Sequence, residues 1–188
     1  MPIWFRPWPQ YLALGAVFCL LKLAHQHATV AELRWLLGPT SALVEVATGT
    51  GATFVPAVGY RNPALGIVLV GSCSGFNFWL LTTTLLAGVA LRQADRVRGR
   101  WLAAALGAGY SLTLLANTAR ILTAVQLGAT LPPRLLGYGW LHQAEGTLVY
   151  IVFLLGGYVA FTAWCRPRAA ASSLDSFTSA PSVNGRPA

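Results

Sequence analysis

The chain has 188 residues, of which 55% are hydrophobic and only 10% are charged. Soluble domains carry about 25% charged residues, so this composition excludes an ordinary soluble domain and indicates a protein that lies in a lipid bilayer. The formal net charge is +8. Because the arginines stand between apolar runs and form no continuous basic face, they indicate membrane orientation and no nucleic-acid partner.

Four apolar runs predict helices that span the membrane, at residues 8–23, 76–91, 101–128 and 146–165. A span takes about 17–25 residues, so neighbouring residues must extend the first two runs. Arg6 before the first run is also typical of a signal peptide, but no small-x-small cleavage site follows it. We therefore expect the first run to be retained as a span.

Between the first two spans, "ATVAELRWLLG" (28–38) places its apolar residues at helical spacing. The next stretch opens with Pro39, which favours the first turn of a helix, and ends with Gly49. We expect one or two short helices here, either at the outer interface or folded back into the bundle. The stretch 53–71 then predicts a small β-hairpin around "YRNP" (60–63), because valine and isoleucine flank turn residues.

The basic residues orient this all-α membrane protein of about four spans. "RQADRVRGR" (92–100), Arg6 and "CRPR" (165–168) are expected in the cytoplasm by the positive-inside rule. Both termini are then cytoplasmic. The segments 24–75 and 129–145 are then expected to face outward, which is the periplasmic side if the membrane is a bacterial inner membrane.

Residues 1–167 are expected to form one membrane-embedded domain. The remainder, 168–188, is small, polar and proline-containing, which is typical of a disordered tail. This tail would lie in the cytoplasm.

Several polar residues converge on the outer membrane boundary in this topology. Asn117 and Arg120, three residues apart and so on one helix face, lie toward the outer end of the third span. His142 and Glu145 share a face where the fourth span opens, and Cys73 lies just outside the second span. A thiol, a guanidinium and an imidazole from separate stretches therefore reach one level.

These groups suit acyl transfer. The Cys73 thiol must lose its proton to attack, and His142 can accept that proton and return it to a leaving amine. Arg120 stays positively charged and can stabilise a developing oxyanion. The flanking Gly71 and Gly75 would let a peptide backbone approach the sulfur.

Each residue also has a structural interpretation. Cys73 can be packing, as we expect for Cys19 and Cys165, because three separated cysteines suit neither a disulfide framework nor a zinc site. Arg120 can extend to the interface. His142 can lie in the headgroup layer.

Glu145, His25 and His27 also have structural interpretations. Glu145 is either an acid favoured by the helix dipole or a partner of His142. His25 and His27 are expected at the membrane interface. With His142 they would give three metal ligands, but no acidic cluster supports a metal site, so neither a metal nor another cofactor is expected.

The motifs "GSCSGFNF" (71–78), "NTARI" (117–121) and "LHQAEG" (141–146) together resemble the exosortase/archaeosortase family. The resemblance spans residues 28–160, and the chain is similar to compact members such as exosortase K, with fewer spans than most. It implies a multi-pass cysteine transpeptidase or protease that acts on exported proteins ending in a short motif, a membrane span and a basic cluster.

The family's catalytic Cys, Arg and His fall on Cys73, Arg120 and His142, and its NxxR pattern begins at Asn117. Ser74 and Gly75 complete the cysteine motif; together with Asn117 and Glu145 they are the expected supporting residues.

Two other functions remain open from the sequence. The protein can be a non-catalytic membrane transporter or assembly subunit, in which Arg120 and Glu145 pair between spans. It can also be a serine enzyme that uses Ser72 or Ser74 near His142.

Overall fold

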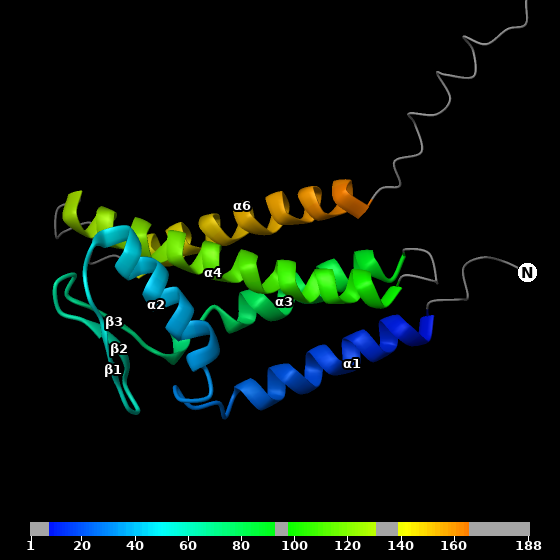
Figure 1. Cartoon of the computed structure of the whole chain (residues 1–188), viewed down its shortest axis with the longest axis horizontal. Helices are drawn as coiled ribbons and strands as arrows, with labels where there is room; N and C mark the ends of the chain where they lie inside the picture. Colours follow the sequence, from blue (N-terminus) through cyan, green and yellow to red (C-terminus); the bar gives the residue numbers. More distant parts are fainter. Residues whose placement is uncertain (1–7, 93–97, 131–138, 166–188) are drawn as a thin grey trace, which may run out of the picture.

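The computed structural model describes residues 8–92, 98–130 and 139–165. Four helices run along its long axis in alternating directions (Figure 1): α1 (Trp8–His25), α3 (Phe76–Ala90), α4 (Arg98–Thr130) and α6 (Gly139–Cys165). The start of α1, the end of α3, the start of α4 and the end of α6 lie at one end of the molecule (Figure 1). The helical prediction is confirmed, although α4 and α6 begin earlier than expected. The predicted tail, 168–188, lies outside the described residues.

Three helical segments among the described residues are long and apolar enough to cross a membrane: Gly71–Ala90, Gly99–Thr130 and Gln143–Cys165. Helix α1 is not one of them. It has 18 residues, with Lys22 and His25 in its last turn, and these polar residues lower its mean hydropathy. Three of the four predicted spans are therefore long and apolar enough to cross a membrane.

One face of α6 is apolar and exposed along its length. Leu148, Ile151, Val152, Leu155 and Val159 are all exposed, and their spacing of three and four residues places them on one stripe of the helix. An apolar stripe of this length on the outside of a bundle is typical of a surface that faces lipid.

Helix α2 (Arg34–Thr48) is one continuous helix that passes through Pro39. Proline has no N–H to bond the carbonyl four residues earlier, here that of Trp35. The Tyr110 hydroxyl of α4 donates to that carbonyl at 2.8 Å, so the lost bond is replaced from another helix. Of the one or two helices expected here, the structure has one, and the bond from Tyr110 compensates for the proline within it.

The turn before α2 carries a reciprocal cap. The Thr29 N–H donates to the Glu32 carboxylate at 2.7 Å, and the Glu32 N–H donates to the Thr29 hydroxyl at 3.4 Å. The Thr29 N–H, and to a lesser degree the Thr29 hydroxyl, which donates to the same carboxylate at 2.8 Å, lower the pKa of Glu32. At its other end α2 stops at Gly49, whose φ of 67° is left-handed, as the glycine predicted.

Helix α2 folds back against the bundle. Its Leu36, Leu37 and Val44 are buried in one hydrophobic cluster with Phe76 of α3 and Ile121 of α4. Of the two predicted placements, the structure thus has the second, against the other helices.

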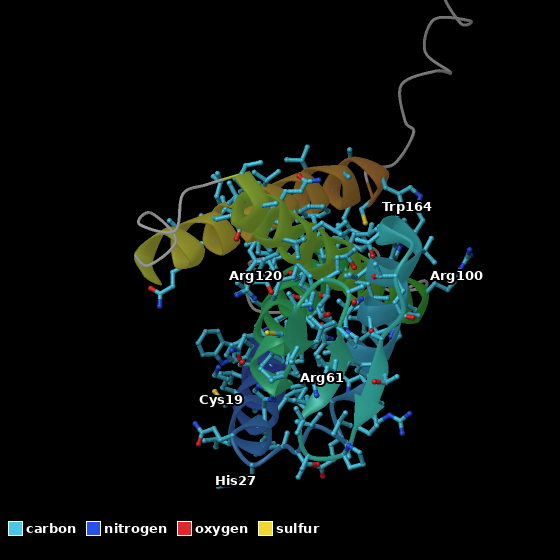
Figure 2. All side chains as sticks on the ribbon, turned by 90° about the vertical axis from the view of Figure 1, so that its left-hand side faces the viewer. Cys19, His27, Arg61, Arg100, Arg120 and Trp164 are labelled. Atoms are coloured by element: carbon cyan, nitrogen blue, oxygen red, sulfur yellow. The ribbon has the colours of Figure 1, made fainter. Side chains whose placement is uncertain are left out.

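The residues before Cys73 form a three-stranded antiparallel sheet in the order β1 (Thr53–Val55), β2 (Gly59–Asn62), β3 (Ile67–Leu69). The hairpin prediction is confirmed for β2 and β3, but the residues of "YRN" lie within the central strand. Asn62 explains the later turn: its buried side-chain oxygen accepts the Leu65 N–H at 3.1 Å. The sheet lies at the end of the bundle opposite the start of α1, with Arg61 on its surface (Figure 2).

Helices α3 and α4 approach closely at a glycine. A Cβ on Gly109 of α4 would meet the Thr83 hydroxyl oxygen and come within 3.1 Å of the Thr83 Cα. Small residues let helix backbones approach in membranes, and here the partner atom is backbone, which cannot move aside easily.

We expect Gly109→Ala to destabilise the protein by about 1–3 kcal/mol, because it overpacks this contact. The matched control is Gly107→Ala, since a Cβ on Gly107 meets nothing within 4 Å. The measurement is the thermal unfolding midpoint in detergent, followed by tryptophan fluorescence. Equal shifts for the two variants would contradict the close approach.

Candidate active site

Cys73 ends a 3₁₀ turn, Gly71–Cys73, that joins β3 to α3. Its N–H donates to the Val70 carbonyl at 2.8 Å, and the residue is partly exposed. The neighbouring Ser74 is only 2% exposed, and its hydroxyl accepts the Phe76 N–H at 3.3 Å. Of these two side chains, the thiol is therefore the accessible nucleophile.

Asn117 of α4 holds this turn in place. Its side chain is fully buried, and its amide nitrogen donates to the Cys73 carbonyl at 2.6 Å. Gly75, with a left-handed φ of 71°, allows the approach: a Cβ there would lie 3.3 Å from the Asn117 Cγ and from a methyl of Thr113. Glycine is therefore favoured at residue 75 for two reasons: the backbone is left-handed there, and a side chain would crowd Asn117 and Thr113.

Tyr150 of α6 extends this network. Its hydroxyl donates to the Asn117 side-chain oxygen at 2.9 Å and accepts a hydrogen bond from the Arg120 guanidinium at 3.4 Å. The Tyr150 ring stacks on Phe78 of α3, with centroids 4.6 Å apart. Arg120, Tyr150, Asn117 and the Cys73 carbonyl thus form one connected chain of polar groups.

Arg120 fits against α6 because residue 146 is glycine. A Cβ on Gly146 would come within 2.6 Å of the Arg120 Nε. The guanidinium carbon also lies 5.5 Å from the centre of the Tyr150 ring, within the range of a cation–π contact. Asn117 and Arg120 therefore both face α6, as their spacing predicted.

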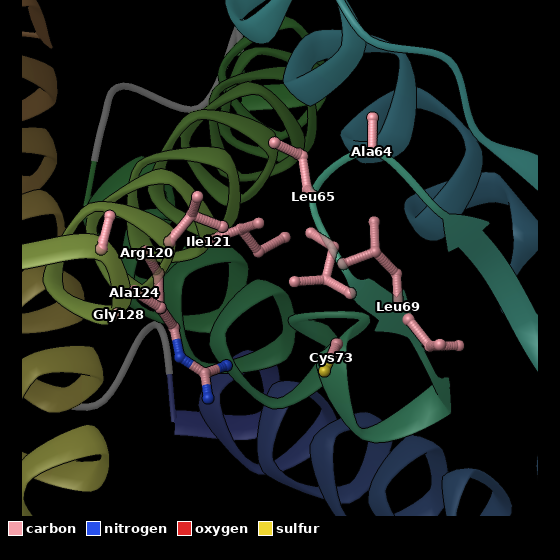
Figure 3. Close-up of a pocket in the computed structure, with 12 residues that line it drawn as sticks. Ala64, Leu65, Leu69, Cys73, Arg120, Ile121, Ala124 and Gly128 are labelled. Carbon is pink, nitrogen blue, oxygen red and sulfur yellow. The ribbon is translucent and has the colours of Figure 1, made fainter. Parts of the chain in front are cut away.

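A cavity of about 730 Å³ separates β3 from the second half of α4, and both Cys73 and Arg120 line it. Figure 3 shows the Cys73 sulfur and the Arg120 guanidinium at the same edge of this space, Cys73 on the turn before α3 and Arg120 on α4. Its walls are otherwise made of apolar residues: Ala64, Leu65, Ile67, Val68, Leu69, Ile121, Ala124, Val125, Gly128 and Ala129.

The other two predicted site residues, His142 and Glu145, belong to α6. The backbone of His142 lies in the first turns of α6, but its side chain is outside the described residues. Position 142 lies one turn before Gly146 and two turns before Tyr150, on the helix face that meets Arg120. Glu145 is partly buried.

A smaller hollow, about 250 Å³, brings His25 near Ser72, Ser74, Arg120 and Tyr150. The sequence predicted that His25 would lie at the interface. The His25 ring stacks on Phe76 of α3, with centroids 4.1 Å apart, and its position relative to the membrane stays a prediction.

Sequence reasoning missed Tyr150, Gly146 and His25 as members of the site. Positions 142, 146 and 150 are four apart, and this spacing alone was a signal that they share a face. No comparable signal marks His25, whose place depends on how α1 packs on α3.

No group of three His, Cys, Asp or Glu side chains that could hold a metal ion occurs among the described residues. The combination of His25, His27 and His142 is not covered by this statement, because the side chain of His142 lies outside the described residues. Comparison of the chain with protein-family models, curated proteins and solved structures finds no match.

We expect Asn117→Leu to destabilise the protein by about 1–3 kcal/mol, since the Cys73 carbonyl loses its donor and the Tyr150 hydroxyl loses its acceptor. The alkylation rate of Cys73 should rise as the turn is released. Thr118→Val is the control, because the buried Thr118 hydroxyl has no hydrogen-bond partner among the described residues. Both effects can be measured in detergent, by thermal unfolding and by maleimide labelling with mass spectrometry. Equal behaviour of the two variants would refute the bracing role of Asn117.

Proposed function

We propose that the chain is a membrane-embedded cysteine transpeptidase or protease of the exosortase type. The observation that supports this best is the shared cavity of Cys73 and Arg120, with both residues tied into one network through Asn117 and Tyr150. In one space, a thiol can attack a carbonyl carbon and a permanent positive charge can stabilise the oxyanion that forms.

The proposed topology has four spans, with α1 as the fourth and both termini in the cytoplasm. It is supported by the alternating helix directions, which bring the start of α1, the end of α3 and the start of α4 to one end (Figure 1). Arg92 and Arg100 lie in these segments. The site then faces the periplasmic side of the inner membrane, at the opposite end.

In the first half of the reaction, the Cys73 sulfur attacks the carbonyl carbon of the scissile amide. The thiol proton passes to His142, a carbon–sulfur bond forms, and the carbonyl electrons move onto oxygen. Arg120 stabilises that oxyanion without giving up a proton. The carbon–nitrogen bond then breaks, and His142 returns the proton to the leaving amine.

The product of these steps is a thioester between Cys73 and the exported part of the substrate. In the second half, an amine or a water molecule attacks the thioester carbonyl and releases the Cys73 thiol. An amine gives transpeptidation and water gives hydrolysis. The proposed substrates are exported proteins with a carboxy-terminal motif, membrane span and basic cluster, and the bilayer holds enzyme and substrate together.

Cys73→Ala should abolish processing of a co-expressed protein that ends in such a signal, because no other group forms the thioester. Cys19→Ala and Cys165→Ala, which remove thiols outside the described cavity, should retain processing. The measurement is the cleaved fraction on an immunoblot, with hydroxylamine added to release the acyl group as a hydroxamate. Cleavage that survives in Cys73→Ala would overturn the proposal and favour Ser72 or Ser74.

Arg120→Gln should lower the processing rate by about 10²–10³-fold, the usual cost of removing one oxyanion donor. His142→Ala should lower it by about 10²–10⁴-fold, the usual contribution of a general acid–base group. His27→Ala is the matched histidine control, and His25→Ala tests the imidazole that lines the smaller hollow. If His25→Ala lost activity and His142→Ala kept it, the base would be assigned to His25.

A further inference from the structure

Strand β3 is an edge strand whose free side borders the large cavity. β2 pairs with β3 on one side only, and the order β1-β2-β3 leaves the other side unpaired within the described residues. Three consecutive residues of the strand, Ile67, Val68 and Leu69, line the cavity. Side chains alternate between the two faces of a sheet, so a lining made of three consecutive residues fits a cavity that borders the free edge of the strand better than one over a single face.

The opposite wall is the part of α4 that follows Arg120. It offers the aliphatic Ile121 and Val125 and the small Ala124 and Gly128. Arg120 is the only charged residue that lines the cavity among the described residues. The space has the volume of a ligand site, typically about 300–1,000 Å³, and an apolar interior.

From this geometry we propose that the substrate segment preceding the scissile bond adds to β3 as a fourth strand. The inference rests on the proposed function and names the mode of recognition at the same site. Backbone N–H and C=O groups on the free edge of β3 bond the peptide, and the cavity accepts its side chains. β3 leads directly into the turn that carries Cys73, so a peptide running parallel to β3 delivers its carbonyl to the thiol.

The cavity also selects the chemistry of the segment. β3 has three residues and a length of about 10 Å, which matches a three-residue peptide. The aliphatic walls favour Val, Ile, Leu or Ala in that peptide, because a charged side chain bound away from Arg120 would lose its hydration without a partner. The part of the substrate before the scissile bond is outside the membrane, on the side from which β3 approaches Cys73.

The test uses a peptide probe with the full chain in nanodiscs, in a Cys19→Ser, Cys165→Ser background. The probe is acetyl-Val-Val-Ala chloromethyl ketone, and the readout is its rate of Cys73 alkylation by intact mass. Two isomers carry one N-methyl group, either on the second valine or on the alanine. In an added strand only one of two adjacent N–H groups faces the partner strand. One isomer should therefore react about tenfold more slowly, the value of one lost hydrogen bond, and the other should react like the parent.

A variant tests the same geometry from the protein side. Ala124→Phe fills the cavity and should slow the peptide probe about tenfold or more, whereas iodoacetamide, which needs no strand, should alkylate Cys73 at an unchanged rate. Ala103→Phe, on the exposed side of α4, is the control and should change neither rate.

The outcomes separate the two proposals. Equal rates for the two isomers, in a protein whose processing still depends on Cys73, would overturn strand addition and leave the thiol enzyme standing. Processing that is independent of Cys73 would overturn the proposed function itself. A disulfide between two copies of a Val68→Cys variant, with no isomer difference, would assign the edge to a second copy of the chain and also overturn strand addition.

Discussion

The buried amide of Asn117 is the interaction on which the rest of the site depends. It bonds the Cys73 carbonyl on one side and the Tyr150 hydroxyl on the other, so one side chain joins the cysteine turn, α4 and α6. In an apolar interior each unsatisfied polar group costs several kcal/mol. Displacing the cysteine turn or α6 would therefore leave one polar atom of Asn117 without its partner, and displacing α4 would leave polar groups unpaired in both of the others.

Glycines make this polar network possible at the packing density of the bundle. Gly75 allows Asn117 to reach the cysteine turn, and Gly146 leaves the space that the Arg120 side chain occupies. Gly109 brings α4 against α3 by the same means. Close backbone approach shortens the distance between side chains on neighbouring helices, so short residues such as Asn117 can bridge them.

The sequence predicted what depends on local pattern. Apolar runs located the helices, and helical periodicity placed Asn117 and Arg120 on one face. It did not predict the continuity of α2 through Pro39. The hydrogen bond that replaces the one lost at Pro39 comes from Tyr110, which is 75 residues from the acceptor Trp35 in the sequence. Tyr150 was missed for a related reason: a tyrosine in an apolar run is typical of packing, and its role follows only from which helix faces α4.

The length of α4 explains how a charge and an apolar cavity can occupy the same place. Arg120 lies ten residues before the end of the helix, or about 15 Å along its axis, and the residues beyond it form a wall of the cavity. The helix thus continues past its charged residue. The Arg120 guanidinium lies on the α6 side, because it donates to the Tyr150 hydroxyl and because Gly146 has no side chain to obstruct it. The charge therefore enters the cavity from one end, beside Cys73, while β3 and the last turns of α4 keep the remaining walls apolar. A peptide bound there would have its apolar residues between β3 and α4 and its reacting carbonyl between sulfur and guanidinium.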